Sequence, residues 1–124
     1  MKKIVKTDKA PGAIGPYSQG VNIGDMFFFS GQIPLDPITG LMPEGIEAQA
    51  HQALKNVVGL LESQGLDFSN VVKTTVFLDN MDDFVAVNDI YATYFVEPFP
   101  ARSAVEVARL PKGALIEVEV IAVK

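Results

Sequence analysis

The sequence contains no cysteine and only one histidine in 124 residues. Without cysteine, the chain cannot form a disulfide framework, a thiolate nucleophile, or a zinc or iron–sulfur site with cysteine ligands. The single histidine, His51, is expected on the polar, solvated side of a helix. A Ser-His-Asp triad or a histidine metal site therefore lacks its main component, which leaves arginine, glutamate, tyrosine and serine as the chemical groups.

Long apolar runs and clusters of basic residues are also missing. No stretch approaches the roughly 20 apolar residues of a transmembrane helix, and the segment after Met1 turns polar without the apolar core of a secretory signal. These absences favour a cytoplasmic protein without a membrane partner. Scattered lysines and arginines and a formal charge of −5 argue against a nucleic-acid partner, because affinity for nucleic acid depends on clustered basic side chains.

The patterns that are present predict one α+β domain over residues 1–124. A short first strand should lead into an ordered loop at Ala10–Tyr17, which holds two glycines and two prolines. A hairpin turn at Gly24-Asp25 precedes an apolar strand at Phe27–Phe29, and a loop at Leu35–Gly45 follows.

Two amphipathic helices are predicted in the middle of the chain. Apolar residues at helical spacing begin at Ile46, and Gly65 stops this first helix. The second helix is capped at Asn80 and ends before Pro98. Its apolar stripe consists of Phe84, Val87, Tyr91, Tyr94 and Phe95.

Three further strands are predicted around the second helix. Val71–Leu78 should be a strand with one face formed by Val72, Thr74, Val76 and Leu78. In the last quarter, Ser103–Arg109 and Leu115–Val123 are expected to form an antiparallel pair joined through Leu110–Ala114.

The predicted sheet has one face that the helices cannot cover. Two helices suffice for one face of five or six strands. The strands at Phe27–Phe29 and Leu115–Val123, however, carry apolar residues on both sides. Such a face exceeds what monomers usually expose, so a partner subunit is the expected cover. The alternative is a strongly curled sheet that buries its own second face.

Arg102 is the first residue with a pattern suited to ligand binding. It follows a rigid Pro100-Ala101 approach at the start of a strand, which would fix the direction of a fork-shaped guanidinium. Such a fork binds a carboxylate through two parallel hydrogen bonds. The alternative is a surface ion pair with Glu106 or Glu117.

Glu117 shares its strand face with Glu119, and this is the face expected to lie between subunits. A carboxylate there is costly unless it serves a ligand or pairs with a basic residue of the interface, and both interpretations stay open. Tyr17 and Ser30 occupy loop and strand-end positions, where a hydroxyl can reach a ligand or form a local hydrogen bond.

Taken together, several motifs resemble the RidA (YjgF) family of reactive-intermediate deaminases along the whole chain. The segments that carry the resemblance are Ala10-Pro11 through Gly15–Gly20, Ser30–Pro34, Val72–Phe77, Val87-Asn88 with Tyr91, Pro100–Val107 and Leu110-Pro111. The resemblance implies a chorismate-mutase-like α+β fold with two helices on one sheet face, and a homotrimer with a central barrel and substrate clefts between subunits.

The activity that the resemblance implies is hydrolysis of 2-iminobutanoate and 2-iminopropanoate, which are reactive imine or enamine acids, to 2-oxo acids and ammonia. It implies neither a metal nor a cofactor. The family's carboxylate-binding arginine falls on Arg102 and its water-orienting glutamate on Glu117. A glutamate of ordinary pKa is already ionised at neutral pH, so Glu117 is expected to act without special tuning.

The resemblance also assigns the substrate-binding positions. They are Tyr17, Ser30, Gly31, Asn88 and Ala104. Many relatives carry cysteine where this chain has Ala104, and only a backbone contact is expected there. The segment between the second helix and Arg102 is shorter than in several relatives, which alters the rim of the cleft.

Two other functions compete with imine hydrolysis. Some relatives are described as translation inhibitors that cleave RNA, although the acidic composition and the lack of a catalytic histidine argue against a ribonuclease. The other alternative is a non-catalytic ligand-sensing, chaperone-like or regulatory protein that uses the same clefts. The presence of Arg102 favours the deaminase over this second alternative.

Overall fold

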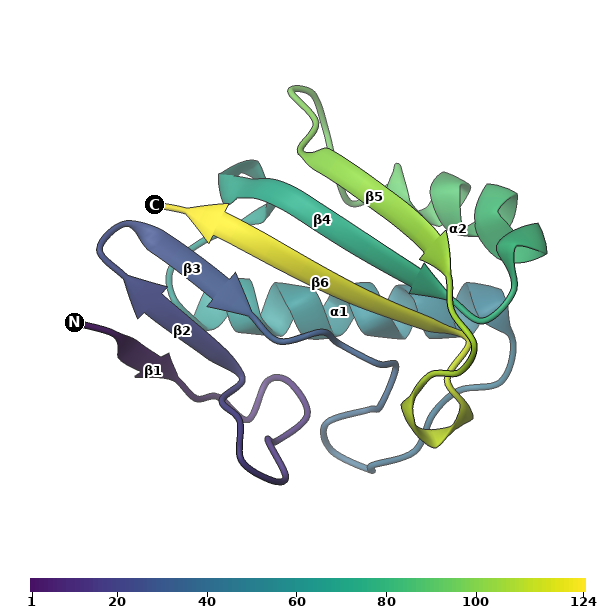
Figure 1. Ribbon diagram of the computed structural model, residues 1–124, viewed down its shortest axis with the longest axis horizontal. Coiled ribbons are helices and arrows are strands. Elements are labelled where there is room, and N and C mark those ends of the chain that lie inside the picture. Colours follow the sequence, from purple (N-terminus) through teal and green to yellow (C-terminus); the bar gives the residue numbers. More distant parts are fainter.

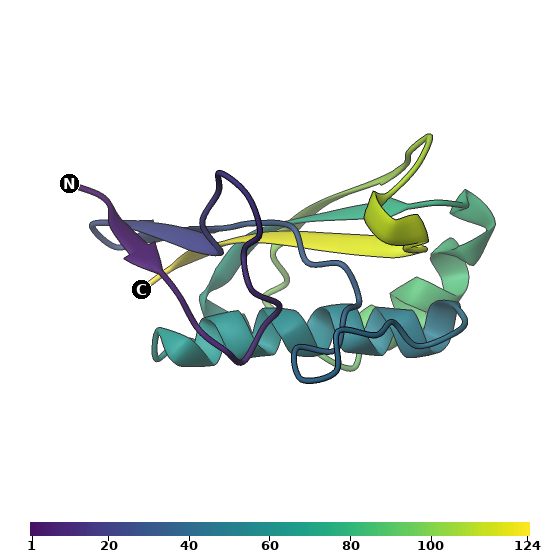
Figure 2. The same ribbon diagram turned by 90° about the horizontal axis from the view of Figure 1, so that it is seen from below.

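The computed structural model describes all 124 residues, and its six strands form one mixed sheet in the order β1-β2-β3-β6-β4-β5. The strands are β1 (Lys3–Val5), β2 (Gly20–Ile23), β3 (Met26–Phe29), β4 (Val71–Leu78), β5 (Ala101–Glu106) and β6 (Ile116–Val123). The helices α1 (Ile46–Ser63) and α2 (Phe84–Tyr91) both lie on one side of the sheet (Figures 1 and 2). The predicted α+β fold is therefore confirmed.

The core lies between the sheet and the two helices. The central strand β6 alternates buried and half-buried residues, because successive side chains of a strand point to opposite faces. Val118 and Val120 point to the helix side, where Leu54 and Leu61 of α1 join the same buried cluster. Full burial of one such side chain contributes about 1.5–3 kcal/mol, so this interface is the main source of stability.

Neither α1 nor α2 covers the other face of the sheet (Figure 2). Phe28 of β3 is 40% exposed there, although Phe27 and Phe29 on either side are buried against the helices. Its register partner Ile121 is only half-buried, and Val105 of β5 is exposed. The sheet does not curl over this side, which contradicts the alternative of a self-covered sheet. We call this surface the open face.

The predicted pairing of the last two strands is wrong. β5 runs parallel to β4, with Thr74 opposite Arg102, and β6 runs antiparallel to β4, with Phe77 opposite Glu117. The helix α2 crosses over between β4 and β5 and returns the chain in the same direction, as crossover connections do. The connection after Glu106 then carries β6 past β4 to its other side, so neighbours in sequence are not neighbours in the sheet.

Two local predictions also fail. Val72 is 46% exposed because the register of β4 shifts between Val71 and Lys73, and this bulge turns Val71 toward the core instead. The second helix ends at Tyr91, earlier than predicted, because Thr93 and Tyr94 form tighter i to i+3 backbone hydrogen bonds that close its last turn.

Candidate active site

The structure divides the predicted site residues into two groups. The first group lies at the open face around Glu117, which β6 holds half-buried. A cavity of about 500 Å³ is lined by Glu117, Tyr17 and Gly31, together with Gln32 and Lys112. Three of the predicted residues therefore share one cavity, although they come from a loop, the end of β3, and β6.

Gly31 determines how closely the Glu117 carboxylate approaches the backbone. A Cβ atom at position 31 would overlap Glu117 Oε2 and would lie 2.8 Å from Glu117 Cδ. Any side chain at position 31 would thus displace the carboxylate. Glycine thus allows the carboxylate to lie against the backbone of residue 31, for reasons of space rather than of backbone conformation.

Burial raises the pKa of the Glu117 carboxyl above its usual range, and the neighbouring Glu119 carboxylate raises it further. The expectation of an ordinary pKa is therefore wrong. The sequence predicted that Glu117 and Glu119 share one strand face, but it did not show that Glu117 is partly desolvated. A carboxylate with a raised pKa is a stronger base, which suits a group that takes a proton from water.

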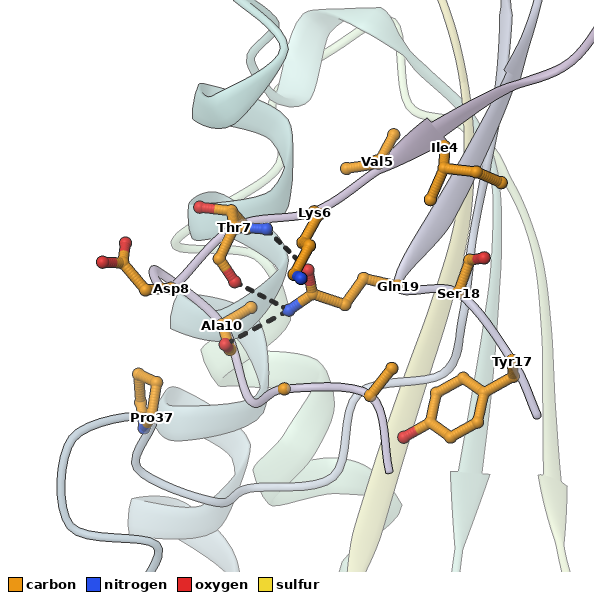
Figure 3. A pocket seen from close by; sticks show the side chains of 12 residues that line it. Ile4, Val5, Lys6, Thr7, Asp8, Ala10, Tyr17, Ser18, Gln19 and Pro37 are labelled. Atoms are coloured by element: carbon orange, nitrogen blue, oxygen red, sulfur yellow. Dashed lines mark hydrogen bonds between the residues drawn. The ribbon is translucent and has the colours of Figure 1, made fainter. Parts of the chain in front are cut away.

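The loop that carries Tyr17 is fixed by the buried side chain of Gln19. Its amide accepts a hydrogen bond from Thr7 N at 2.6 Å and donates to Thr7 O at 2.9 Å and to Ala10 O at 3.3 Å (Figure 3). It also donates to Pro11 O at 2.8 Å. Tyr17 lines both the Glu117 cavity and a second hollow of about 640 Å³ beside β1. Gln19 thus positions Tyr17, a role that the motif around it did not reveal.

Ser30 forms a local hydrogen bond rather than pointing freely into the cavity. Its Oγ donates to Ser18 O at 2.6 Å, which ties the end of β3 to the Tyr17 loop. Ser30 also lines a neighbouring hollow of about 540 Å³ with Glu119 and Tyr17. Its hydroxyl oxygen keeps lone pairs that can accept from a ligand.

The second group surrounds Arg102 on the outer strand β5. Arg102 Nη1 donates to Asn88 Oδ1 at 2.8 Å, and the guanidinium carbon lies 4.8 Å from the ring centroid of Tyr91 and 5.3 Å from that of Phe84. Asn88, Tyr91 and Arg102 line a hollow of about 400 Å³. Four of the five N–H donors of the guanidinium remain available to a ligand.

The alternative of an Arg102 ion pair is not observed within the chain. Glu106 instead accepts a hydrogen bond from Met81 N at 2.8 Å, at the start of the turn that precedes α2. Glu117 lies on the opposite face of the sheet. Arg102 is therefore held by an amide and two aromatic rings, none of which neutralises its charge.

The backbone at Ala104 faces the unpaired edge of β5. Val107 N donates to Leu78 O on β4, and alternate residues of a strand point their N–H and C=O groups to opposite edges. The odd-numbered residues of β5 thus pair with β4, and Arg102 and Ala104 offer their backbone groups outward. This orientation agrees with the backbone contact expected at Ala104.

The two groups do not meet within one subunit. Paired residues of neighbouring strands share a face, so Arg102 lies on the side of Thr74, which faces the helices, and Glu117 lies on the side of Phe77. Thr74 and Phe77 are three residues apart on a regular stretch of β4 and point to opposite faces. Asn88 accompanies Arg102, whereas Tyr17 and Gly31 accompany Glu117.

His51 differs from its prediction as a solvated residue. It is half-buried, and its Nδ1 lies 2.9 Å from the hydroxyl of Tyr94. This pair belongs to the helix layer and joins neither group of site residues. No cluster of three or more histidine, aspartate or glutamate side chains is arranged to hold a metal ion, and no helix is long and apolar enough to cross a membrane.

Comparison with known proteins places this arrangement in a family. The Endoribonuclease L-PSP family matches residues 7–124. A 2-iminobutanoate/2-iminopropanoate deaminase of Salmonella typhimurium is 53% identical to the chain over 127 residues, which cover 100% of this chain and 99% of the relative. The chain therefore belongs to the Endoribonuclease L-PSP family, which includes the RidA (YjgF) proteins that its motifs resemble.

Two solved structures show the same fold. The Escherichia coli YjgF gene product superimposes with a TM-score of 0.94 at 52% identity, and the match covers 98% of each chain. Escherichia coli TdcF, crystallised with bound serine, also has a TM-score of 0.94, at 46% identity and 98% coverage of each chain. At such similarity this chain has the same overall fold as these two structures.

Proposed function

We propose that this chain is a 2-iminobutanoate/2-iminopropanoate deaminase, a hydrolase that acts on C=N bonds of small 2-imino acids. The observation that carries the proposal is the full-length match at 53% identity to a deaminase of that name, in a chain that keeps Arg102 and Glu117. Serine bound to TdcF supports a small ligand with a carboxylate. We assign the site to Arg102, Glu117, Tyr17, Ser30, Gly31, Asn88 and Ala104.

The complete site is proposed to form between two subunits. Arg102 and Glu117 lie on opposite faces of the sheet, so one small substrate cannot contact both within one chain. The open face needs a cover, and the edge of β5 offers unpaired backbone groups next to Arg102. In a homotrimer whose sheets form a central barrel, Arg102 and Asn88 of one subunit would face the Glu117 cavity of the next.

Binding begins with the carboxylate of the imino acid. The guanidinium of Arg102 takes it through two parallel, charge-assisted hydrogen bonds, since only one of its donors is used by Asn88. We propose that the backbone at Ala104 and the hydroxyl of Tyr17 support the bound acid. A fixed carboxylate then sets the direction of the C=N bond toward Glu117.

Hydrolysis adds one water molecule across the C=N bond. The water oxygen attacks the carbon of the protonated imine while Glu117 accepts a proton from the water, and the electron pair of the C=N bond moves to nitrogen. Glu117 then returns this proton to the amine nitrogen of the carbinolamine. The C–N bond breaks and ammonia leaves, and the hydroxyl proton passes to the Glu117 carboxylate as the C=O bond of the 2-oxo acid forms. No oxidant, reductant or covalent enzyme intermediate is needed for this balance.

The raised pKa of Glu117 fits this role. An iminium group is positively charged, so its arrival next to Glu117 favours the ionised carboxylate at the moment when a base is required. The same carboxyl, once protonated, can return a proton to the departing nitrogen. A cavity that desolvates Glu117 therefore makes one residue serve in both steps.

The rival ribonuclease activity has one observation in its favour, the description of the family as an endoribonuclease. The chain carries a formal charge of −5, and its only histidine is bonded to Tyr94 away from both groups of site residues. We therefore propose that nucleic acid is not a partner and that the protein acts in the cytoplasm on a small imine.

A coupled assay tests the proposed function. A threonine dehydratase generates 2-iminobutanoate, and the loss of the imine is followed with and without the purified protein. We expect faster loss of the imine with wild type, and no cleavage of RNA in the same buffer. An unchanged imine lifetime would contradict the proposal, and RNA cleavage that is lost in Arg102→Ala or Glu117→Gln would favour the ribonuclease.

A further inference from the structure

Arg102 stands on the outermost strand of the sheet, is exposed, and makes no ion pair, yet its guanidinium has a defined place. A free arginine side chain samples many rotamers, and holding it in one orientation costs conformational entropy each time a ligand binds. Asn88 fixes only Nη1. A second group must define the plane of the guanidinium if two of its N–H groups are to form parallel hydrogen bonds with a carboxylate.

Tyr91 supplies that plane. Its ring centroid is 4.8 Å from the guanidinium carbon of Arg102, closer than the 5.3 Å of Phe84. At this distance the ring face attracts the cation and offers it a flat surface to lie on. Because Tyr91 is at the end of α2 and Arg102 is on β5, the contact links the helix layer to the edge of the sheet.

The ring of Tyr91 is itself held on two sides. Its hydroxyl lies 2.8 Å from Thr74 Oγ1, and its other face stacks on Phe95 with centroids 4.2 Å apart and planes 19° from parallel. Tyr91 is 6% exposed and Thr74 is fully buried. A buried hydroxyl pair in the core is strong because neither group has water as an alternative partner.

Thr74 and Arg102 are also register partners on β4 and β5. Thr74 therefore lies beside Arg102 in the sheet, its hydroxyl contacts the hydroxyl of Tyr91, and the Tyr91 ring contacts the guanidinium of Arg102. Rotation of the Arg102 side chain would break only its contact with the Tyr91 ring, because the contact between Tyr91 and Thr74 does not depend on it. The Tyr91 ring, held by Thr74, therefore defines one orientation of the guanidinium.

We propose that Tyr91, anchored by Thr74, is the positioning residue that orients the Arg102 guanidinium for the substrate carboxylate, an assignment that rests on the proposed function. The carboxylate is bound equally in the ground state and in the transition state. Loss of this positioning therefore raises KM and leaves kcat nearly unchanged. A purely structural residue would lower the thermal midpoint without this division between KM and kcat.

The test compares Tyr91→Leu with Tyr91→Phe and Tyr94→Leu. Tyr91→Leu removes the ring, and we expect KM for 2-iminobutanoate to rise about tenfold with kcat within about twofold of wild type. Tyr91→Phe keeps the ring but loses the hydroxyl that bonds to Thr74, so its KM should fall between those of wild type and Tyr91→Leu. Tyr94→Leu is the matched control, because Tyr94 belongs to the same aromatic cluster but bonds to His51 rather than contacting Arg102.

A second readout makes the inference independent of turnover. Isothermal titration with 2-oxobutanoate, the product acid, should show about tenfold weaker binding to Tyr91→Leu and wild-type affinity for Tyr94→Leu. If wild type binds 2-oxobutanoate but hydrolyses no imine, the proposed function fails and this titration alone decides the role of Tyr91. Should Tyr91→Leu not fold, Tyr91→Met, which fills irregular space better, takes its place.

Three results would overturn the proposal. One is a KM and a 2-oxobutanoate affinity of Tyr91→Leu within twofold of wild type. Another is an equal loss in Tyr94→Leu, which would show that disturbance of the cluster and not the ring under Arg102 is responsible. The third is a wild-type protein that does not bind 2-oxobutanoate, since Arg102 would then hold no carboxylate.

Discussion

Arg102 differs from an ordinary surface arginine in the groups that hold it. One amide oxygen and two ring faces fix the guanidinium, and no carboxylate of the chain neutralises it. A cation held in this way keeps most of its donors for a ligand. The side chain packs little into the core, so its removal should affect activity far more than stability.

The corresponding prediction concerns Arg102→Ala and Arg102→Lys. Loss of two charge-assisted hydrogen bonds to the carboxylate should lower kcat/KM for 2-iminobutanoate by about 100-fold or more in Arg102→Ala. Lysine is a point charge without the planar fork, so Arg102→Lys should recover only part of this loss. Steady-state kinetics, with thermal midpoints measured beside wild type, provide the check. Near-normal turnover by Arg102→Ala would favour the sensing or chaperone function instead.

Glu117→Gln tests the base and its raised pKa together. Removal of the carboxylate should lower kcat more than it raises KM, because water loses its proton acceptor. In wild type, folding raises the pKa of the Glu117 carboxyl, so the ionised carboxylate is less favourable in the folded state than in the unfolded state. Stability is therefore lost as pH rises from the unfolded-state pKa through the folded-state pKa.

The thermal midpoint of Glu117→Gln should consequently exceed that of wild type at pH 7, and the difference should vanish below about pH 4, where glutamate is protonated in both states. Calorimetry across this pH range measures the difference. A midpoint that falls at pH 7 would show that the ionised carboxylate stabilises the protein, contrary to the desolvation described above.

At the scale of elements, the end of β3 and the strand β6 approach each other closely beside the cavity that we propose to be catalytic. Gly31 of the segment after β3 has no room for a side chain beside Glu117. Gly31→Ala should displace the carboxylate and reduce kcat by at least about tenfold, because misplacement of a catalytic group by one ångström is sufficient for such losses. Gly12→Ala, where a Cβ meets nothing within 4 Å, is the matched control. Equal activities of the two variants would contradict the proposed role of this approach.

The sequence predicted the elements better than their pairing. Turn residues at Gly24-Asp25 and the helical spacing from Ile46 are local signals, and both predictions are confirmed. The partner of β5 is set by the crossover through α2, which is a tertiary choice that strand patterns do not encode. The prediction that Val72 shares a face with Thr74 failed for a similar reason, because a bulge changes which residue faces the core without changing the strand pattern.

The candidate site shows the same limit. The sequence alone was enough to propose Arg102 and Glu117, since a charge at a strand start and a charge on an apolar face are both local anomalies. The sequence did not predict that Arg102 and Glu117 lie on opposite faces of the sheet, because this depends on the register of β5 and β6 against β4. The anchoring of Tyr91 by Thr74 also escaped detection, since a threonine in a strand and a tyrosine in a helix stripe are ordinary core residues.

At the scale of the whole molecule, the open face predicts assembly. Phe28 is 40% exposed at the centre of this face, and its partner Ile121 is only half-buried. Light scattering on wild type should give the mass of a trimer at micromolar concentration.

Phe28→Asp should shift the mass toward the monomer, because a carboxylate would be buried without a partner. Ile38→Asp, at a residue 91% exposed on a loop, should stay trimeric. A monomeric wild type would contradict the proposed site.

The central claim is that imine hydrolysis takes place in a site completed by two subunits, and mixed oligomers test it most directly. Arg102→Ala and Glu117→Gln are unfolded together at equal concentration, refolded and assayed with 2-iminobutanoate. Each variant lacks what the other keeps, so about one quarter of the sites in a random mixture contain both Arg102 and Glu117. We predict activity near one quarter of refolded wild type. Activity no greater than that of the two variants refolded separately would contradict a site shared between subunits.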